Sequence, residues 1–131
     1  MINYSATVKI SSQQLIELFE DSGIQRPTND KLRVSRMINN ANLLYTAWDG
    51  ETLVGVARGF SDQAYCCYLS DLAIKKDYQK QGIGQQLIQK IHSDLGPKIS
   101  LVLTAAPTAK GYYPKVGFEN IDSGFKLARK Y

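Results

Sequence analysis

The sequence predicts an α/β (α+β) fold in which a mixed, mostly antiparallel sheet carries helices on both faces. Three apolar segments between residues 43 and 74 are separated only by short turns, and segments joined in this way pair as an antiparallel meander. The stretch from Tyr65 to Thr104 instead has the order strand, helix, strand, which requires a parallel and right-handed crossover. A sheet with both kinds of connection is expected to have helices on both faces.

The first part of the chain is expected to form a strand from Tyr4 to Ile10, followed by two helices. Ser11 or Ser12 can cap the first helix, which runs to about residue 20, because a serine hydroxyl accepts hydrogen bonds from the free amides of a first helical turn. The second helix is expected at residues 29–39, with Thr28 as its cap.

Turn residues then separate the remaining elements. Asp49-Gly50 is a strong hairpin signal, because both residues adopt the positive φ angles that tight hairpin turns need. Gly96-Pro97 ends the longest helix and precedes an apolar strand that we expect to be buried. The elements expected after residue 40 are strands at 43–48, 53–60 and 65–74, a helix that ends near Leu95, a strand at 99–104, a helix at 108–115, and strands at 117–118 and 125–129.

Length and composition predict one globular domain, residues 1–131. No apolar run approaches the ~20 residues of a membrane span, and the N-terminus lacks the pattern of a signal peptide, so a cytoplasmic protein without membrane contact is expected. The net charge of +4 is not gathered in a basic stripe, which argues against nucleic-acid binding. Cys66 and Cys67 are adjacent in a strand and point to opposite faces; with only one histidine in the chain, neither a disulfide nor a metal site is expected.

A glycine-containing turn between a strand and the longest helix is the main functional signal. The strand ends at Ile74, the turn contains Gly82 and Gly84, and apolar residues then recur every four positions from Ile83 to Leu95. The first amides of a helix lack intrahelical partners, and the helix dipole adds partial positive charge there. Because glycine lets an anion approach the backbone closely, this arrangement predicts a phosphate site.

Two phosphate-binding motifs do not fit this turn. A Walker loop requires G-x-x-x-x-G-K-[ST], which the sequence lacks, and a dinucleotide fingerprint requires a third glycine where Leu87 stands. What remains is the run from Gln79 to Gly84, with the pattern [Q/R]-x-x-G-x-[G/A]. This run resembles the loop with which GNAT acetyltransferases hold the pyrophosphate of acetyl-coenzyme A (acetyl-CoA).

A second match to this family lies after the next expected strand. Residues 109–118, AKGYYPKVGF, resemble the family segment A-x-x-x-Y-x-x-x-G-F, and its tyrosine falls on Tyr113. Lys76 stands where many members have proline, and Ala106 stands where asparagine is common, which puts in doubt a side-chain contact to the cofactor at that position. The resemblance covers about residues 43–118 and implies the GNAT fold.

The resemblance also implies how acetyl-CoA is held. The pyrophosphate would face the amides of the glycine turn, and the pantetheine arm would pair with the preceding strand, so that the amide of Ile74 points at the thioester carbonyl. The cofactor-binding residues expected on this basis are Leu72, Ala73, Ile74, Gln79, Lys80, Gln81, Gly82, Ile83, Gly84, Gln85 and Tyr113.

Two residues are expected to handle protons. Tyr113, with Tyr112 as the reserve, would protonate the leaving thiolate, because a phenol of pKa ~10 can donate to a thiolate whose acid has a pKa of ~8.5. Asp71 would accept the proton of the attacking amine, because it is the only carboxylate within its strand and is expected to share an apolar face with Leu69 and Ala73. The alternatives are a structural role for Asp71 and simple packing for Tyr113.

Two functions remain from the sequence. The first is an N-acetyltransferase that moves an acetyl group from acetyl-CoA to a primary amine by direct attack on the thioester. The second is a non-catalytic module that senses an acyl-CoA or binds a partner; the presence of both the glycine turn and Tyr113 favours the enzyme. The acceptor is expected to be a small-molecule or peptide amine, bound in a groove without an acidic cluster. Members of the family commonly dimerise, so a homodimer is also implied, although no residue determines it.

Overall fold

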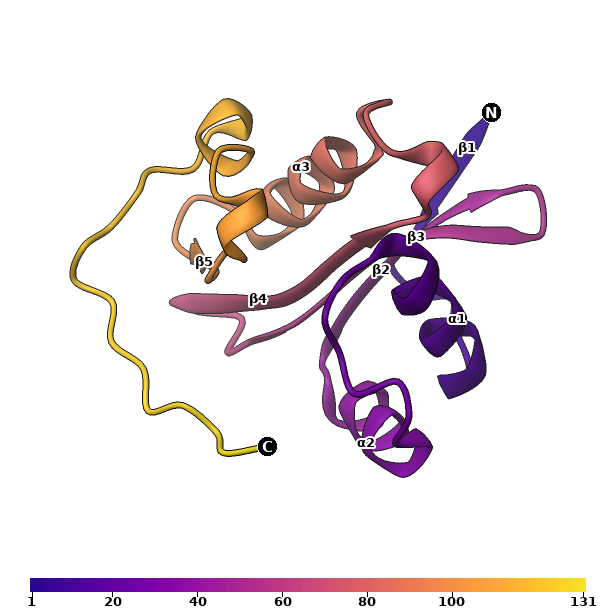
Figure 1. The fold of residues 1–131 in the computed structure, drawn as a ribbon. Coiled ribbons are helices and arrows are strands. Elements are labelled where there is room, and N and C mark those ends of the chain that lie inside the picture. The colour runs from indigo at the N-terminus through magenta and orange to yellow at the C-terminus, as the bar shows by residue number, and fades with distance from the viewer.

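The computed structural model describes residues 1–131 and confirms the predicted mixed α/β fold (Figure 1). Its single sheet has five strands in the order β1-β2-β3-β4-β5, and only the β4–β5 pair is parallel. The α-helices and strands are β1 (Ile2–Ser5), α1 (Ser12–Ser22), α2 (Lys31–Asn40), β2 (Leu43–Asp49), β3 (Thr52–Ser61), β4 (Cys66–Ile74), α3 (Ile83–Leu95) and β5 (Ser100–Val102).

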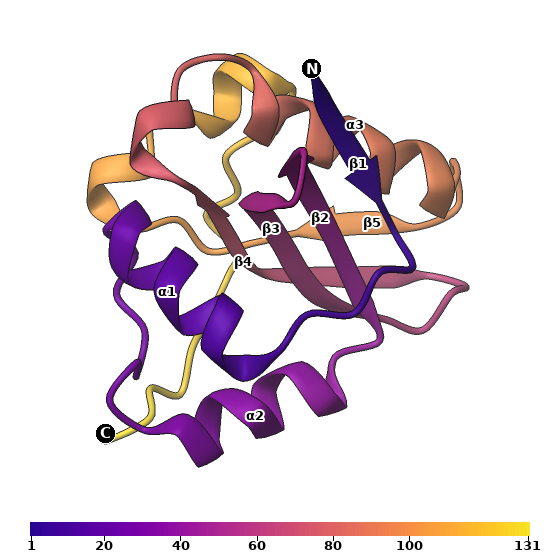
Figure 2. The ribbon, with the colours of Figure 1, turned by 90° about the vertical axis from the view of Figure 1, so that its right-hand side faces the viewer.

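Helices α1 and α2 cover one face of the sheet, and α3 covers the other (Figures 1 and 2). Each layer has its own cluster of buried side chains, and neighbouring residues of β3 contribute to different clusters: Val56 packs with Phe19 of α1, whereas Ala57 packs with Leu87 of α3. This is the period-two alternation of a strand that is buried on both faces. None of the helices has the length and apolar character needed to cross a lipid bilayer.

The first strand is shorter than predicted and begins earlier, at Ile2–Ser5 instead of residues 4–10. The reason is local. The hydroxyl of Ser5 accepts hydrogen bonds from the amides of Thr7 and Val8, at 3.1 and 3.0 Å, and this turn takes the chain out of the sheet toward α1.

Side-chain caps fix the starts of both N-terminal helices. Ser11 caps α1 as predicted and forms a capping box, because its hydroxyl accepts the amide of Gln14 at 3.1 Å while Gln14 Oε1 accepts the amide of Ser11 at 2.9 Å. The predicted cap of α2, Thr28, is wrong. Asp30 Oδ1 accepts the amide of Arg33 at 3.1 Å instead, so α2 begins at Lys31.

A β-bulge interrupts the pairing of β3 with β4. Arg58 pairs with Asp71 and Gly59 pairs with Leu69, so Ser70 has no opposite residue. The extra residue changes which face of the sheet the following side chains occupy. Leu69, before the bulge, packs on the α3 side, whereas Ala73, after it, packs on the α1–α2 side. The predicted shared face of Leu69 with Asp71 and Ala73 is therefore wrong.

Gly59 is required at this bulge. A Cβ atom at position 59 would lie 2.3 Å from the main-chain oxygen of Tyr68, a distance that no side chain can accommodate. The absence of a side chain thus lets β3 and β4 approach each other where the extra residue is inserted.

The last strand is also shorter than predicted. Strand β5 spans Ser100–Val102 instead of residues 99–104, and Val102 is exposed, because β5 is the edge of the sheet. It pairs with β4 only at Cys66, Cys67 and Tyr68. Beyond Tyr68, β4 is therefore bound by β3 on one side and by no strand on the other.

The C-terminal part differs most from the prediction. Two 3₁₀-helices, Pro107–Ala109 and Tyr113–Val116, replace the helix expected at 108–115, because Pro114 has no backbone N–H to donate in the hydrogen bonds of a continuous α-helix. The strands predicted at 117–118 and 125–129 do not form. Residues 119–131 run as an extended tail, drawn yellow in Figure 1, whose Phe125 and Leu127 are fully exposed, because no neighbouring strand of this chain takes up its backbone groups.

Candidate active site

The early end of the β4–β5 pairing leaves backbone groups of β4 free beside the N-terminus of α3. The amide of Lys75 donates to the carbonyl of Val54, in β3, at 2.8 Å. Along an antiparallel pair, every second residue directs its backbone N–H and C=O toward the partner strand, and the residues between direct theirs away from it. Ala73 therefore bonds to β3, whereas Leu72 and Ile74 direct their amides to the open side. Of the three strand residues predicted to bind the cofactor, only these two present free amides there.

The N-terminus of α3 carries three more free amides. Gly82 is the N-cap, with φ of 85°, and no side chain caps the helix. The first amide with an intrahelical partner is that of Gln86, which donates to the carbonyl of Gly82 at 3.0 Å, so the amides of Ile83, Gly84 and Gln85 have no partner. The first turn contains no acidic residue. Three adjacent unpaired amides at the positive end of a helix dipole fit a phosphate group.

The other residues of the predicted loop support its shape. Gln79 Nε2 donates to the main-chain oxygens of Ile74 and Ser22, at 2.9 and 3.2 Å, and so joins the loop to β4 and α1. Gln81 Nε2 donates to the main-chain oxygen of Asp77 at 3.2 Å. The side-chain nitrogens of both glutamines are thus bound to backbone, whereas Lys80, with φ of 64°, is exposed without an ion-pair partner.

Tyr112 and Tyr113 lie at the other side of this junction. Their rings meet edge to face with centroids 5.2 Å apart, and the ring of Tyr113 makes a similar contact with Phe118 at 5.5 Å. Tyr112 also lies over the first turn of α3: a Cβ atom at Gly84 would come within 2.9 Å of its hydroxyl oxygen. The sequence alone did not indicate this contact, which gives Gly84 a packing role in addition to the predicted binding role.

The hydroxyls of both tyrosines are available as proton donors. Neither forms a hydrogen bond within the chain. Burial raises the pKa of Tyr113, and the neighbouring Tyr112 raises it further, while the positive charge of Arg26 acts in the opposite direction with less effect. Burial also raises the pKa of Tyr112. Both phenols therefore keep their protons at neutral pH.

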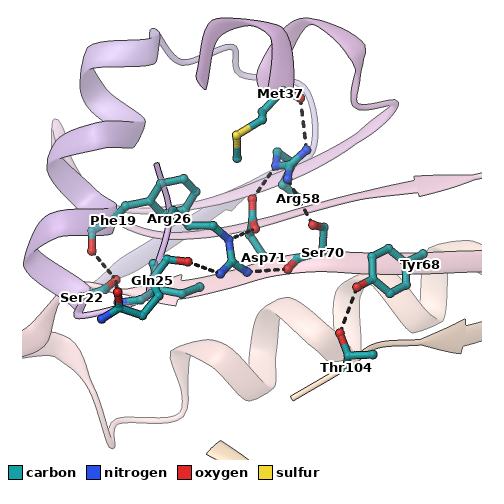
Figure 3. Close-up of polar contacts among 11 residues, drawn as sticks. Phe19, Ser22, Gln25, Arg26, Met37, Arg58, Tyr68, Ser70, Asp71 and Thr104 are labelled. Atoms are coloured by element: carbon teal, nitrogen blue, oxygen red, sulfur yellow. Dashed lines mark hydrogen bonds and ion pairs between the residues drawn. The ribbon is translucent and has the colours of Figure 1, made fainter. Parts of the chain in front are cut away.

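The surroundings of Asp71 differ from the apolar neighbours predicted for it. Its side chain is fully buried, but its Oδ1 accepts a hydrogen bond from Arg26 Nε at 2.6 Å, and its Oδ2 accepts one from Arg58 Nε (Figure 3). Arg26 comes from the loop between α1 and α2, and Arg58 from β3 at the bulge. Neither pairing follows from a local pattern, since 45 and 13 residues separate the partners.

Both arginines also hold the bulged residue. Arg26 Nη2 donates to the main-chain oxygen of Ser70 at 2.8 Å, and Arg58 Nη2 donates to its hydroxyl at 3.2 Å (Figure 3). Asp71 thus accepts charge-assisted hydrogen bonds on both oxygens, and both oxygens are bound by guanidinium groups. The geometry is that of a structural ion-pair cluster beside the free edge of β4.

A family model decides the relationship of this chain to known proteins. Residues 9–128 match the model described as acetyltransferase (GNAT) domain. The chain belongs to the GNAT acetyltransferase family. The resemblance expected from the two sequence motifs is thereby confirmed.

Curated GNAT relatives share limited identity with this chain. An uncharacterized N-acetyltransferase, ycf52, of Gracilaria tenuistipitata var. liui is 28% identical over 106 residues, which cover 79% of this chain and 58% of the relative. A histone acetyltransferase, TAP1, of Glycine max is 33% identical over 79 residues, which cover 56% of this chain and 33% of the relative. The chain therefore spans little more than half, or only a third, of the length of these relatives.

Solved GNAT structures share the fold over the whole chain. A probable acetyltransferase of unknown function from meticillin-resistant Staphylococcus aureus aligns over 100% of both chains with a TM-score of 0.84 at 20% identity. An aminoglycoside N-acetyltransferase solved in complex with CoA covers 100% of this chain and 96% of its own, with a TM-score of 0.73 at 14% identity. At identities of 20% and 14%, these comparisons establish a shared fold and no more.

Proposed function

We propose that this protein is an N-acetyltransferase that moves an acetyl group from acetyl-CoA to a primary amine by direct attack on the thioester. The observation that carries the proposal is the junction of the free β4 edge with the uncapped N-terminus of α3, beside a tyrosine hydroxyl without a partner. This junction has helix amides that can bind a phosphate group and a free strand edge that can pair with an extended, amide-bearing arm. It also has a hydroxyl that can protonate a leaving sulfur.

The proposed roles follow from the free groups. The amides of Ile83, Gly84 and Gln85 bind the pyrophosphate, with Lys80 nearby as an exposed cation. Leu72 and Ile74 pair with the pantetheine arm, and the amide of Ile74 stabilises the oxyanion of the thioester carbonyl. Acetyl-CoA supplies the activated acetyl group when bound.

Tyr113 is the proposed proton donor to the leaving sulfur. Its hydroxyl has no partner within the chain, and burial holds its pKa above the ordinary value, so the donor form persists at neutral pH. Tyr112 is placed differently, because its hydroxyl lies against Gly84 at the proposed pyrophosphate site.

For Asp71 we propose a positioning role in place of the predicted base. Its two ion pairs hold Arg26 and Arg58 against the bulge, and this fixes the strand that carries Leu72 and Ile74. The ammonium group of the acceptor would then lose its proton to water at the open side of the site.

The test is the release of CoA thiol from acetyl-CoA in the presence of a panel of primary amines. The proposal expects thiol release that depends on both enzyme and amine, together with acetylated amine detected by mass spectrometry. Tight binding of acetyl-CoA without turnover of any amine would instead favour the alternative, a non-catalytic acyl-CoA-binding module.

We also propose that the protein forms a homodimer through its C-terminal tail. The support is that β5 has a free edge, while the tail exposes Phe125 and Leu127 at alternating positions, as a strand would. Light scattering after gel filtration should give a dimer, and a Phe125→Ser, Leu127→Ser variant should give a monomer. A monomeric parent protein at ~100 μM would contradict this proposal, since a stable dimer with Kd of ~1 μM would be almost fully associated.

A further inference from the structure

An open groove of ≈ 800 Å³ lies between α2 and the end of β3. Its polar and aromatic lining includes Asp30, Arg33, Arg36, Asn40, Arg58 and Phe60. Three of these side chains are arginines, and Arg33 and Arg36, one turn apart on α2, are both exposed. The groove therefore presents guanidinium groups to whatever enters it.

The charges along this side are not balanced. Both ion pairs of the structure involve Asp71, so neither Arg33 nor Arg36 is paired with an aspartate or glutamate side chain. Asp30 serves as the cap of α2. The lining contains three guanidinium groups and one carboxylate, that of Asp30, so its side chains carry a net charge of +2.

The groove shares a wall with the proposed active site. Arg58 lines the groove and is bonded to both Asp71 and Ser70, two residues at the start of the free edge of β4 (Figure 3). Arg58 is buried, and its Nη1 donates to the main-chain oxygen of Met37 on α2 at 3.2 Å. The cluster of Arg58, Asp71 and Arg26 therefore carries a net charge of +1. This charge lies in a low-dielectric wall between the groove and the reacting edge, where it acts on a ligand more strongly than a solvated charge.

The donors of Arg33 are open to an oxygen ligand. Arg33 Nη2 donates to the main-chain oxygen of Tyr131 at 3.2 Å, the contact that brings the end of the tail to α2. This contact is a single hydrogen bond, whereas arginine can bind a carboxylate or phosphate with two parallel hydrogen bonds.

We infer that the amine acceptor carries an oxyanion, a carboxylate or a phosphate, which Arg33 and Arg36 bind while the amine lies at the free edge of β4. This inference rests on the proposed acetyltransferase function and names the class of its acceptor. It sets this protein apart from the structurally similar aminoglycoside N-acetyltransferase. An aminoglycoside carries several ammonium groups, which a groove of net positive charge repels.

The test compares matched acceptors by kcat/KM in the thiol-release assay. The series consists of ω-amino carboxylates of increasing length, each paired with its ω-amino carboxamide and with the corresponding aminoalkyl phosphonate, plus spermidine as a polycation. The charged and neutral members of a pair have similar amine groups. The ratio of their kcat/KM values therefore measures how much binding of the oxyanion at Arg33 and Arg36 contributes. We expect an anionic member to be preferred at least ~10-fold at about 0.05 M salt and less at about 0.5 M, since salt screens exposed charges.

Arg33→Gln and Arg36→Gln should lower this ratio toward one, mainly through KM for the anionic acceptor. Lys31→Gln is the matched control, because Lys31 is an exposed cation of the same helix that does not line the groove, and it should leave the ratio unchanged. Thermal melting of each variant verifies that the fold is intact.

Equal kcat/KM values for charged and neutral members would overturn the inference while leaving the acetyltransferase function in place. An equal loss of the ratio in Lys31→Gln would overturn it too, because the effect would then be one of overall charge. Failure of every amine, with acetyl-CoA still bound, would overturn the acetyltransferase function and this inference together. The comparison of carboxylates with phosphonates identifies which oxyanion is bound.

Discussion

Arg26 Nε lies 2.6 Å from Asp71 Oδ1, and this contact joins the loop between α1 and α2 to the bulge of β4. Asp71 is fully buried, whereas about a quarter of the Arg26 side chain is exposed, at 26%. A buried carboxylate is tolerated only if its lone pairs are satisfied, and Arg58 supplies the second partner. The pair therefore fixes the position of the strand edge at which we propose the reaction occurs.

The first prediction concerns the stability that this cluster provides. Asp71→Asn removes the charge that compensates two buried or half-buried guanidinium groups, so it should lower the free energy of unfolding by ~3 kcal/mol or more. Urea denaturation measures the change. Asp77→Asn, at an exposed aspartate without an ion pair, should change stability by less than ~0.5 kcal/mol. If both variants unfold like the parent, the cluster does not stabilise the fold.

The second prediction concerns the bulge. Gly59→Ala places a Cβ atom 2.3 Å from the main-chain oxygen of Tyr68, so β3 and β4 must separate, and the loss of stability should exceed ~2 kcal/mol. Chemical denaturation and hydrogen exchange of the β4 amides would detect this change. Gly111→Ala, where no atom lies within 4 Å of the added Cβ, should be nearly neutral, and an equally stable Gly59→Ala variant would contradict the structure.

The third prediction concerns the amides at the start of α3. Gln85→Glu places a carboxylate in the first turn, where it stabilises the helix dipole by ~0.3–1 kcal/mol but repels a pyrophosphate. The Kd of acetyl-CoA should rise at least ~10-fold by calorimetry while the melting temperature stays the same or increases. Gln89→Glu, one turn further along α3, should change the Kd much less. An unchanged Kd for Gln85→Glu would show that the pyrophosphate does not bind at the N-terminus of α3.

The fourth prediction separates the two tyrosines. Tyr113→Phe should lower kcat by ~100-fold, the lower end for general acid catalysis, with little change in the Kd of acetyl-CoA, because the hydroxyl acts only as the sulfur leaves. Tyr112→Phe removes a hydroxyl that lies against Gly84 and should affect the Kd more than kcat. A fully active Tyr113→Phe enzyme together with a slow Tyr112→Phe enzyme would reverse the assignment.

The fifth prediction is the alkaline limit of activity. Burial raises the pKa of Tyr113 above its ordinary value of ~10, so the protonated donor persists and kcat should not fall until the pH exceeds ~10. The same shift means that the folded state holds this proton more tightly than the unfolded state. Its contribution to stability is therefore complete below pH ~10 and is lost as the pH rises through the folded-state pKa. A pH–kcat profile with a limb below 9 that is absent in Tyr113→Phe would contradict the raised pKa.

The positions of most helices and strands followed from local patterns in the sequence. The helix with apolar residues every four positions spans Ile83–Leu95, and the Asp49-Gly50 turn separates β2 from β3. These features depend on periodicity, capping and turn chemistry within a few residues, and such interactions act in the same way before the chain has folded. The glycine turn and the Y-x-x-x-G-F segment were likewise sufficient to indicate the family.

Only the tertiary structure decided what surrounds Asp71 and where the chain stops forming strands. The bulge at Ser70 shifts the face of β4 by one residue, and a period-two pattern cannot reveal an inserted residue. Arg26 and Arg58 reach the Asp71 carboxylate from distant parts of the chain. The sequence around Asp71 is apolar, and the prediction that its carboxylate has only apolar neighbours was therefore wrong. The predicted strand at 125–129 fails for a related reason: alternation describes a segment able to pair, but a strand forms only where another strand offers its backbone.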